Sequence, residues 1–280
     1  MTIHFGSGKG STPALALIAL VAVSGCSSTH SNAEADSAIR AKLAQLSEQS
    51  GNSGEQLASL GLAASQSPSN AAVQIRYATA LANAGRNLQA LQVATPVYDR
   101  DKGPTSLGLL IGRLHIRLEE SEAAASAYRQ VLAGEPENIE ALNGLGIAEV
   151  MQGTLAAAET ALRHAVADAP ADTFSRNNLA LALALERKTD EAIPTLQALL
   201  REDSSSRRVR ANLALAYTLS GDREKATATL LPIMNSSEAQ TAIDGYSRIG
   251  VTGQAAVQQS GADHTANLLA ASDGHPAPIR

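Results

Sequence analysis

The chain has little of what disulfides, zinc sites and nucleic-acid surfaces require. It contains one cysteine, no tryptophan, five Tyr and two Phe in 280 residues. One cysteine cannot form an internal disulfide or a cysteine-rich zinc site. Lys and Arg total 22 against 27 Asp and Glu, for a net charge of −5. A phosphate-neutralising surface is therefore not expected, and aromatic platforms for stacked bases are scarce, so nucleic acid is excluded as a partner.

The sequence also lacks the side-chain patterns that most catalytic and metal sites use. Its six histidines do not fall at metal-ligand spacings, and it has no HExxH motif, nucleophile elbow or paired Cys/His arrangement. We therefore expect that the protein is not an enzyme. We assign it no catalytic residue and no metal site.

The first 25 residues have the composition of a secretory signal peptide. They contain Lys9, no acidic residue, and an apolar run from Ala14 to Val23. That run is well short of the roughly 20 residues that a helix needs to cross a bilayer. We predict a signal peptide at residues 1–25, because a short apolar run after a basic start is typical of such segments.

The residues Val23-Ser24-Gly25-Cys26 resemble a bacterial lipobox. The resemblance implies that cleavage leaves Cys26 first and that its thiol carries a covalent lipid, the only cofactor we expect. Residues 26–35 would then be a lipidated N-terminus and polar tether. Ser27 resembles the residue found in lipoproteins of the Gram-negative outer membrane, which implies a lipid-anchored protein facing the periplasm. The alternative is a cleaved signal peptide with an incidental cysteine.

A period of 34 residues runs through the middle of the chain. An alanine recurs five times at this spacing, and a large residue followed by a small one recurs in the same phase. Such a period is typical of repeat proteins built from helix pairs, because small residues let two helix axes cross closely. The alanines are Ala90, Ala124, Ala158, Ala192 and Ala226, and the pairs are Tyr77-Ala78, Ile111-Gly112, Leu145-Gly146, Leu179-Ala180 and Leu213-Ala214.

These residues resemble the tetratricopeptide repeat, a helix-turn-helix unit with small residues at positions 8 and 20. Five repeats, starting at residues 71, 105, 139, 173 and 207, would fill residues 71–240. The resemblance implies an all-α fold, an α-solenoid of stacked repeats. We expect a degenerate capping helical pair at 36–70. For 241–280 we expect the end of a capping helix, which spans about 237–249, and a disordered tail.

Helix boundaries follow from capping residues and prolines. Side chains that accept from free amides precede four first helices, at Asn70, Asn138, Asp172 and Ser206, whereas Pro104 breaks the series. Prolines late in two second helices, at Pro96 and Pro232, are expected to kink or end them. For the starts of the second helices we predict caps at Asn87, Ser121, Thr154, Thr189 and Asp222.

The resemblance also predicts a peptide-binding groove, because first helices line the concave face of such arrays. Asn178 and Asn212 occupy a position where family members often bond a peptide backbone, and an amide offers both a donor and an acceptor. The alternative is that these side chains are solvated or bond the neighbouring repeat. The candidate groove residues are Arg76, Arg113, Asn143, Ile147, Asn177, Asn178, Leu181, Asn212 and Leu215.

A basic cluster lies near the start of the fifth repeat. Arg207, Arg208 and Arg210 follow Arg201 within ten residues. A cluster of this kind is usually a solvated helix start. An acidic partner is the functional alternative.

The fourth and fifth repeats carry a closer resemblance. The segments 175–186, 190–196 and 208–217, with Gly221-Asp222, resemble the TadD lipoproteins of tight-adherence (Flp) pilus loci. The resemblance implies a non-enzymatic scaffold for Flp, or type IVb, pilus assembly and secretion. Its partner would be a protein or peptide, an outer-membrane secretin or another pilus component. The alternative is a lipoprotein scaffold for outer-membrane protein insertion or for regulation of cell-wall enzymes.

Overall fold

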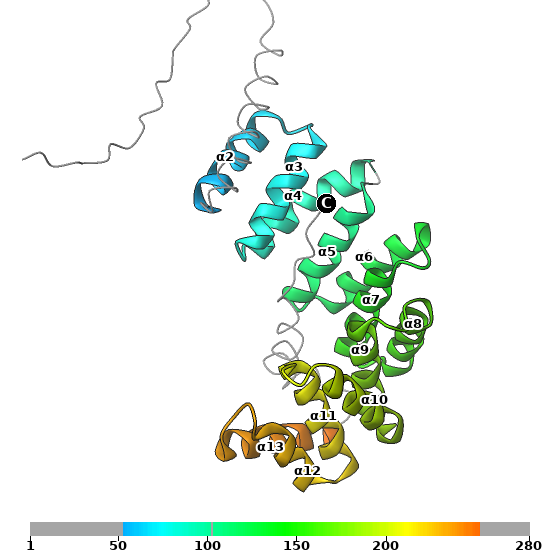
Figure 1. Cartoon of the computed structure of the whole chain (residues 1–280). Coiled ribbons are helices and arrows are strands. Elements are labelled where there is room, and N and C mark those ends of the chain that lie inside the picture. The colour runs from blue at the N-terminus through cyan, green and yellow to red at the C-terminus, as the bar shows by residue number, and fades with distance from the viewer. Residues whose placement is uncertain (1–52, 102, 253–280) are drawn as a thin grey trace, which may run out of the picture.

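The structure is a computed structural model that describes residues 53–101 and 103–252. Within these ranges all regular structure is helical, and the helices stack in chain order along a curved array (Figure 1). This confirms the predicted all-α solenoid. The helices are α2 (Ser53–Gln66), α3 (Ala71–Asn83), α4 (Asn87–Asp101), α5 (Thr105–Arg117), α6 (Ser121–Gly134), α7 (Ile139–Gln152), α8 (Leu155–Asp168), α9 (Thr173–Leu185), α10 (Thr189–Glu202), α11 (Arg207–Ser220), α12 (Arg223–Leu230) and α13 (Ser236–Thr252).

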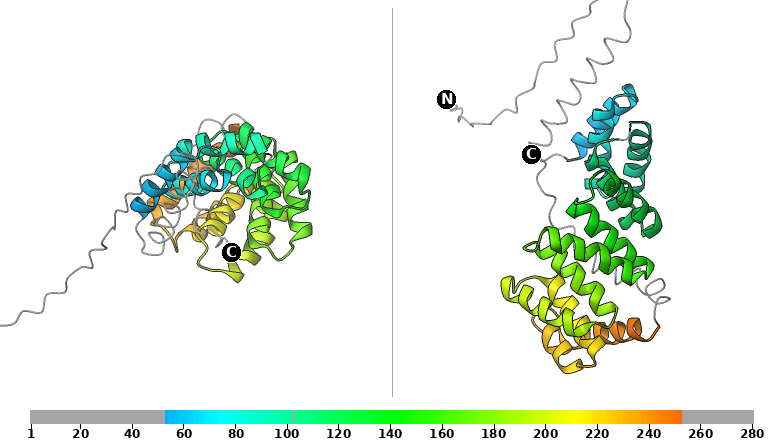
Figure 2. Two further views of the ribbon diagram at one scale, coloured as in Figure 1. Left: turned by 90° about the horizontal axis from the view of Figure 1, so that it is seen from above. Right: turned by 90° about the vertical axis from the view of Figure 1, so that its right-hand side faces the viewer.

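The two helices of each repeat take different places in the array. The first helices, from α3 to α11 in alternation, contact one another more closely than the second helices, from α4 to α12, do. Because the side of a stack with closer spacing is the inside of its bend, the first helices line the inner face of the curve seen in Figure 2.

The small residues of the 34-residue period lie where two helices cross. All five periodic alanines are fully buried. A Cβ atom placed on Gly146 of α7 would lie 2.4 Å from Cγ of Leu162 on α8. The period therefore reports the close helix crossing that the sequence predicts.

The turn inside each repeat uses one left-handed residue. Gly85, Gly153 and Gly221 have positive φ, and so do Glu119 and Arg187 in the same phase. In the third repeat the amide of Gly153 donates to the carbonyl of Val150 at 3.0 Å, and the next amide, of Thr154, donates to Glu149 at 2.9 Å. This Schellman pattern satisfies carbonyls at the end of the first helix.

Glu119→Gly is expected to raise the free energy of unfolding by up to about 1 kcal/mol. The left-handed conformation, φ 60° at Glu119, costs a residue with a Cβ about 1–2 kcal/mol, and glycine's extra entropy in the unfolded chain offsets part of the gain. Urea unfolding of the two proteins measures the difference. Gly85→Ala is the matched control and should destabilise, since no atom lies within 4 Å of its added Cβ and only backbone strain acts.

The predicted caps of the first helices form, whereas those of the second helices do so once. Asn138 accepts from the amide of Ala141 at 2.9 Å, and Asn70, Asp172 and Ser206 cap in the same way. Of the second-helix caps, only Asp222 accepts from an amide of its helix. The other predictions were wrong because Asn87, Ser121 and Thr189 are already the first residues of their helices, and the hydroxyl of Thr154 bonds Glu149 instead.

The two late prolines behave differently. Helix α12 ends at Leu230, before Pro232, as predicted. Helix α4 runs through Pro96 and continues to Asp101, so this proline does not end it. Ala94 and Val97 on either side of Pro96 are buried, and their packing keeps the segment in place.

Helix α13 closes the C-terminal side of the array and is slightly longer than the predicted 237–249. Its residues Ala239, Ile243 and Tyr246 join the core cluster of α11 and α12. Burial raises the pKa of the Tyr246 phenol to about 12. Among the described helices, none is both long and apolar enough to cross a membrane. The predictions for 1–52, including Cys26, and for the tail from residue 253 lie outside the described residues.

Candidate functional site

All nine predicted groove residues lie on first helices, and the four asparagines among them are buried. Asn143, Asn177, Asn178 and Asn212 are 3%, 2%, 4% and 1% exposed, respectively. They come from α7, α9 and α11, which lie side by side on the inner face. A buried amide needs partners for its donor and its acceptor, so the hydrogen bonds of these side chains define the site.

Two asparagine pairs connect neighbouring first helices. Nδ2 of Asn178 donates to Oδ1 of Asn143 at 3.2 Å, and Nδ2 of Asn212 donates to Oδ1 of Asn177 at 3.0 Å. Each pair spans 35 residues, so the same geometry recurs one repeat later. These amides therefore bond the neighbouring repeat, which is the alternative that the sequence left open. Peptide binding by the same residues stays a prediction.

The two pairs differ in how completely their polar atoms are satisfied. Nδ2 of Asn143 also donates to the carbonyl of Ile139 at 3.0 Å and to Oγ of Ser175 at 2.6 Å. In the second pair, Nδ2 of Asn177 and Oδ1 of Asn212 are buried and have no hydrogen-bond partner. An unsatisfied buried polar atom costs about 1–3 kcal/mol, so this pair stores a cost that the first pair does not.

The ring of Phe174 lies beside the second asparagine pair and carries a cation. The guanidinium carbon of Arg208 lies 5.3 Å from the centre of the ring, across the boundary between α9 and α11. Sequence analysis did not select Phe174, and it assigned Arg208 only to a basic cluster. The available signal was the spacing, because the two residues occupy the same repeat position 34 residues apart.

The remaining predicted groove residues have mixed surroundings. Arg76 is exposed on α3, and Arg113 of α5 forms an ion pair with Glu140 of α7. Ile147 is half-buried, and the last two predicted residues, Leu181 and Leu215, are 5% and 1% exposed. All three of these apolar side chains belong to the core cluster of the C-terminal repeats. The inner face is thus polar and basic on α3 and α5 and apolar from α7 onward.

The structure divides the predicted basic cluster. Arg210 donates to the carbonyls of Ser204 at 2.6 Å and Thr229 at 3.3 Å, so it holds the turn before α11 and α12 in place. Arg208 stacks on Phe174. Arg201 and Arg207 are exposed. Two of the four arginines therefore have structural contacts, and two face solvent.

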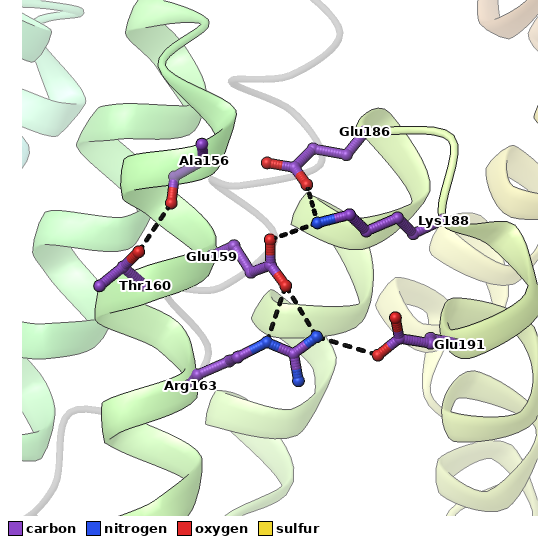
Figure 3. Close-up of polar contacts among 7 residues, drawn as sticks. All are labelled: Ala156, Glu159, Thr160, Arg163, Glu186, Lys188 and Glu191. Carbon is purple, nitrogen blue, oxygen red and sulfur yellow. Dashed lines mark hydrogen bonds and ion pairs between the residues drawn. The ribbon is translucent and has the colours of Figure 1, made fainter.

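On the outer side, charged side chains connect α8 to α10 (Figure 3). Glu159 accepts from Nζ of Lys188 at 2.5 Å and from Nε of Arg163 at 2.7 Å. Arg163 also donates to Glu191 at 2.9 Å, and Lys188 pairs with Glu186 at 2.6 Å. The hydrogen bond from Lys188, then that from Arg163, lowers the pKa of Glu159 to about 2.

The Glu159 network is expected to weaken in acid. A carboxyl whose pKa falls from 4.5 to about 2 on folding stabilises the fold above pH 4.5, and that contribution disappears between pH 4.5 and 2. The stability difference between wild type and Glu159→Gln should therefore be largest above pH 4.5 and shrink toward pH 2, as thermal unfolding at several pH values measures. A difference independent of pH would contradict the assignment. High salt should also reduce it.

Within the ranges 53–101 and 103–252, no group of three or more His, Cys, Asp or Glu side chains is placed to hold a metal ion. The described polar groups instead bond one another, as amide pairs on the inner face and as ion pairs on the outer face. Such an arrangement presents a surface and provides no cluster of catalytic groups. Its chemistry is that of recognition.

Comparison with known proteins agrees with this architecture. Residues 109–173 match the family model described as tetratricopeptide repeat. A tetratricopeptide repeat protein from Parabacteroides merdae superposes with a TM-score of 0.66 at 18% identity, over 86% of this chain and 94% of that one. The chain therefore contains tetratricopeptide repeats, and its described helices form a solenoid of that type.

Two further solved structures share the fold. MamA from Desulfovibrio magneticus RS-1 gives a TM-score of 0.57 at 18% identity, over 61% of this chain and 97% of that one. The anaphase-promoting complex assembly Cut9-Hcn1 gives 0.58 at 17% identity, over 78% of this chain and 44% of that one. No curated protein matches the chain. At these identities the likeness concerns the fold.

Proposed function

We propose that the chain is a non-enzymatic protein-binding scaffold that uses the inner face of its first helices. The tetratricopeptide repeats support this, because stacked helix pairs present an extended concave surface and little else. The half-buried pair Phe174 and Arg208, beside amides with unused hydrogen-bonding atoms, is the observation that carries the proposal. Aromatic and arginine side chains are the types enriched where proteins bind one another.

We further propose that the scaffold is anchored by a lipid on Cys26 to the outer membrane and faces the periplasm. The sequence supports this through the apolar run ending at Val23 and the lipobox-like residues before Cys26. Two acyl chains are enough for stable anchoring. Cys26→Ala should move the protein from the membrane fraction to the soluble fraction and abolish palmitate labelling. An unchanged label would refute the anchor.

The system we propose for this scaffold is assembly of Flp pili. The supporting observation is the resemblance of residues 175–186 and 208–217 to TadD lipoproteins. A tethered scaffold meets a membrane partner at high effective concentration, so weak contacts suffice to position a secretin or another pilus component. The second candidate is a scaffold for outer-membrane protein insertion or cell-wall enzymes, which the same anchored array would suit.

Crosslinking in living cells followed by purification of a tagged copy tests the proposal. Recovery of a secretin or pilus proteins, together with loss of surface pili in a deletion strain at normal porin levels, is the expected result. Falling porin levels or altered cell shape would instead favour the second candidate. Recovery of no envelope protein by a folded, anchored chain would overturn the scaffold function itself.

A further inference from the structure

We propose that the boundary between α9 and α11 holds a subsite for an acidic side chain on an extended protein segment. Four residues build it: Phe174, Asn177, Arg208 and Asn212. The inference rests on the protein-binding function proposed above and adds the chemistry of the partner. Other occupants, such as neutral or basic segments, are outcomes of the test.

The four side chains form one continuous patch in two layers. On α11, Arg208 and Asn212 are four residues apart, so they lie on the same side of the helix. On α9, Phe174 and Asn177 are three residues apart and share a side in the same way. The outer layer is the stack of Arg208 on Phe174 at 5.3 Å, and the inner layer is the amide pair at 3.0 Å.

The outer layer carries positive charge that local acids do not balance. The first turn of α11 contains no acidic residue, and Arg207 is exposed beside Arg208. Positive charges at the start of a helix oppose its dipole, so an anion there is favourable. The nearby acids are engaged elsewhere: both oxygens of Glu202 accept from Arg176, and Asp203 accepts from Ser205.

Arg208 is suited to bind a carboxylate while it stays on the ring. Its guanidinium has five N–H donors directed in its plane, enough for several acceptors at once. Stacking on Phe174 fixes that plane, so less side-chain freedom is lost when a carboxylate binds. A bidentate pair between a guanidinium and a carboxylate is stronger than a neutral hydrogen bond.

The inner layer matches the backbone that such a side chain belongs to. Nδ2 of Asn177 is an unused donor and Oδ1 of Asn212 an unused acceptor, and both atoms are buried. The peptide group of an extended segment offers the complementary carbonyl and N–H. A small rotation of the two amides brings these atoms to the segment, and binding then removes the cost of leaving them unsatisfied.

The boundary one repeat earlier supplies a matched control. The residues 34 positions before Arg208 and Phe174 are Phe174 itself and Glu140, so an acid is part of that patch. Its amide pair, Asn143 with Asn178, has no unused donor on Asn143, which bonds Ile139 and Ser175. This boundary should therefore not select an acidic segment.

The test uses two fluorescein-labelled peptides that differ only in charge. One alternates Asp with Ala over about ten residues, the other alternates Asn with Ala, and fluorescence anisotropy measures their affinity for the purified full-length chain. We expect the acidic peptide to bind roughly 10- to 100-fold more tightly, the worth of a charge-assisted hydrogen bond. Arg208→Gln should remove that preference, and the control Asn143→Ala should keep it.

A second readout separates binding from folding. Isotope-edited spectra of the side-chain amide of Asn177 should shift on addition of the acidic peptide to wild type but not to Arg208→Gln, whose melting curve verifies its fold. Equal affinity for the two peptides, or a preference that survives in Arg208→Gln, would overturn the subsite. If the chain with Arg208→Gln still captures its envelope partner in cells, the subsite fails and the scaffold function stands.

Discussion

Gly144→Ala is expected to lower the free energy of unfolding by about 1–3 kcal/mol, although alanine is the better helix former. A Cβ atom on Gly144 would lie 2.2 Å from the ring of Tyr128. The ring is 2% exposed and cannot move away, because a Cβ on Gly112, on its other side, would lie only 2.6 Å from it. The new methyl group must therefore push α7 away from α6. Urea unfolding measures the loss.

Gly245→Ala is the control for this substitution. Gly245 also lies inside a helix, α13, but no atom lies within 4 Å of its added Cβ. Only helix propensity acts there, so this variant should gain up to about 1 kcal/mol. If Gly144→Ala were as stable as Gly245→Ala, the tight contact between α6 and α7 would be wrong.

Arg129→Met is expected to destabilise the protein by about 1–3 kcal/mol, because it leaves a buried carboxylate without its cation. Glu149 is 4% exposed and forms an ion pair with Arg129 across α6 and α7. The hydroxyl of Thr154 also bonds the Glu149 side chain, but a hydroxyl does not replace a charge. Thermal and urea unfolding at neutral pH measure the effect.

The double variant Arg129→Met/Glu149→Leu tests the cause. Leu81 and Leu183 occupy the position of Glu149 in the first and fourth repeats, so a leucine suits this place in the array. Replacing both members of a buried ion pair with apolar side chains is often neutral or stabilising. The double variant should regain wild-type stability. A double variant as unstable as the single one would mean that Arg129 stabilises by packing, not by charge.

The period predicted the fold because it depends on steric contacts that every repeat shares. Gly146 and Ala158 are small for the same reason as their counterparts, so one unit predicts the next. The second-helix caps failed where that identity breaks: Glu119 and Arg187 take the left-handed position without being glycine. Their helices then begin one residue before the predicted Ser121 and Thr189 caps permit.

The candidate site was harder to predict because its bonds connect unlike positions. A 34-residue period aligns Asn143 with Asn177, whereas the bond from Asn143 goes to Asn178, one residue further. Repeat position placed the asparagines on the inner face but did not indicate that they bond each other. The stack of Arg208 on Phe174 depends on side-chain direction across two helices, which the sequence does not encode locally.

The links on both sides of the C-terminal repeats have a mechanical consequence. Helices α7 to α11 are joined by amide pairs on the inner face, and α8 is joined to α10 by ion pairs on the outer face. A load pulling on the N-terminal side enters the array at α2, whose repeat neighbours lack both kinds of link among the described contacts. Because each repeat contacts only its neighbours, the array should unravel under tension from α2 inward. The surface formed by α9 and α11 would be the last to lose its shape.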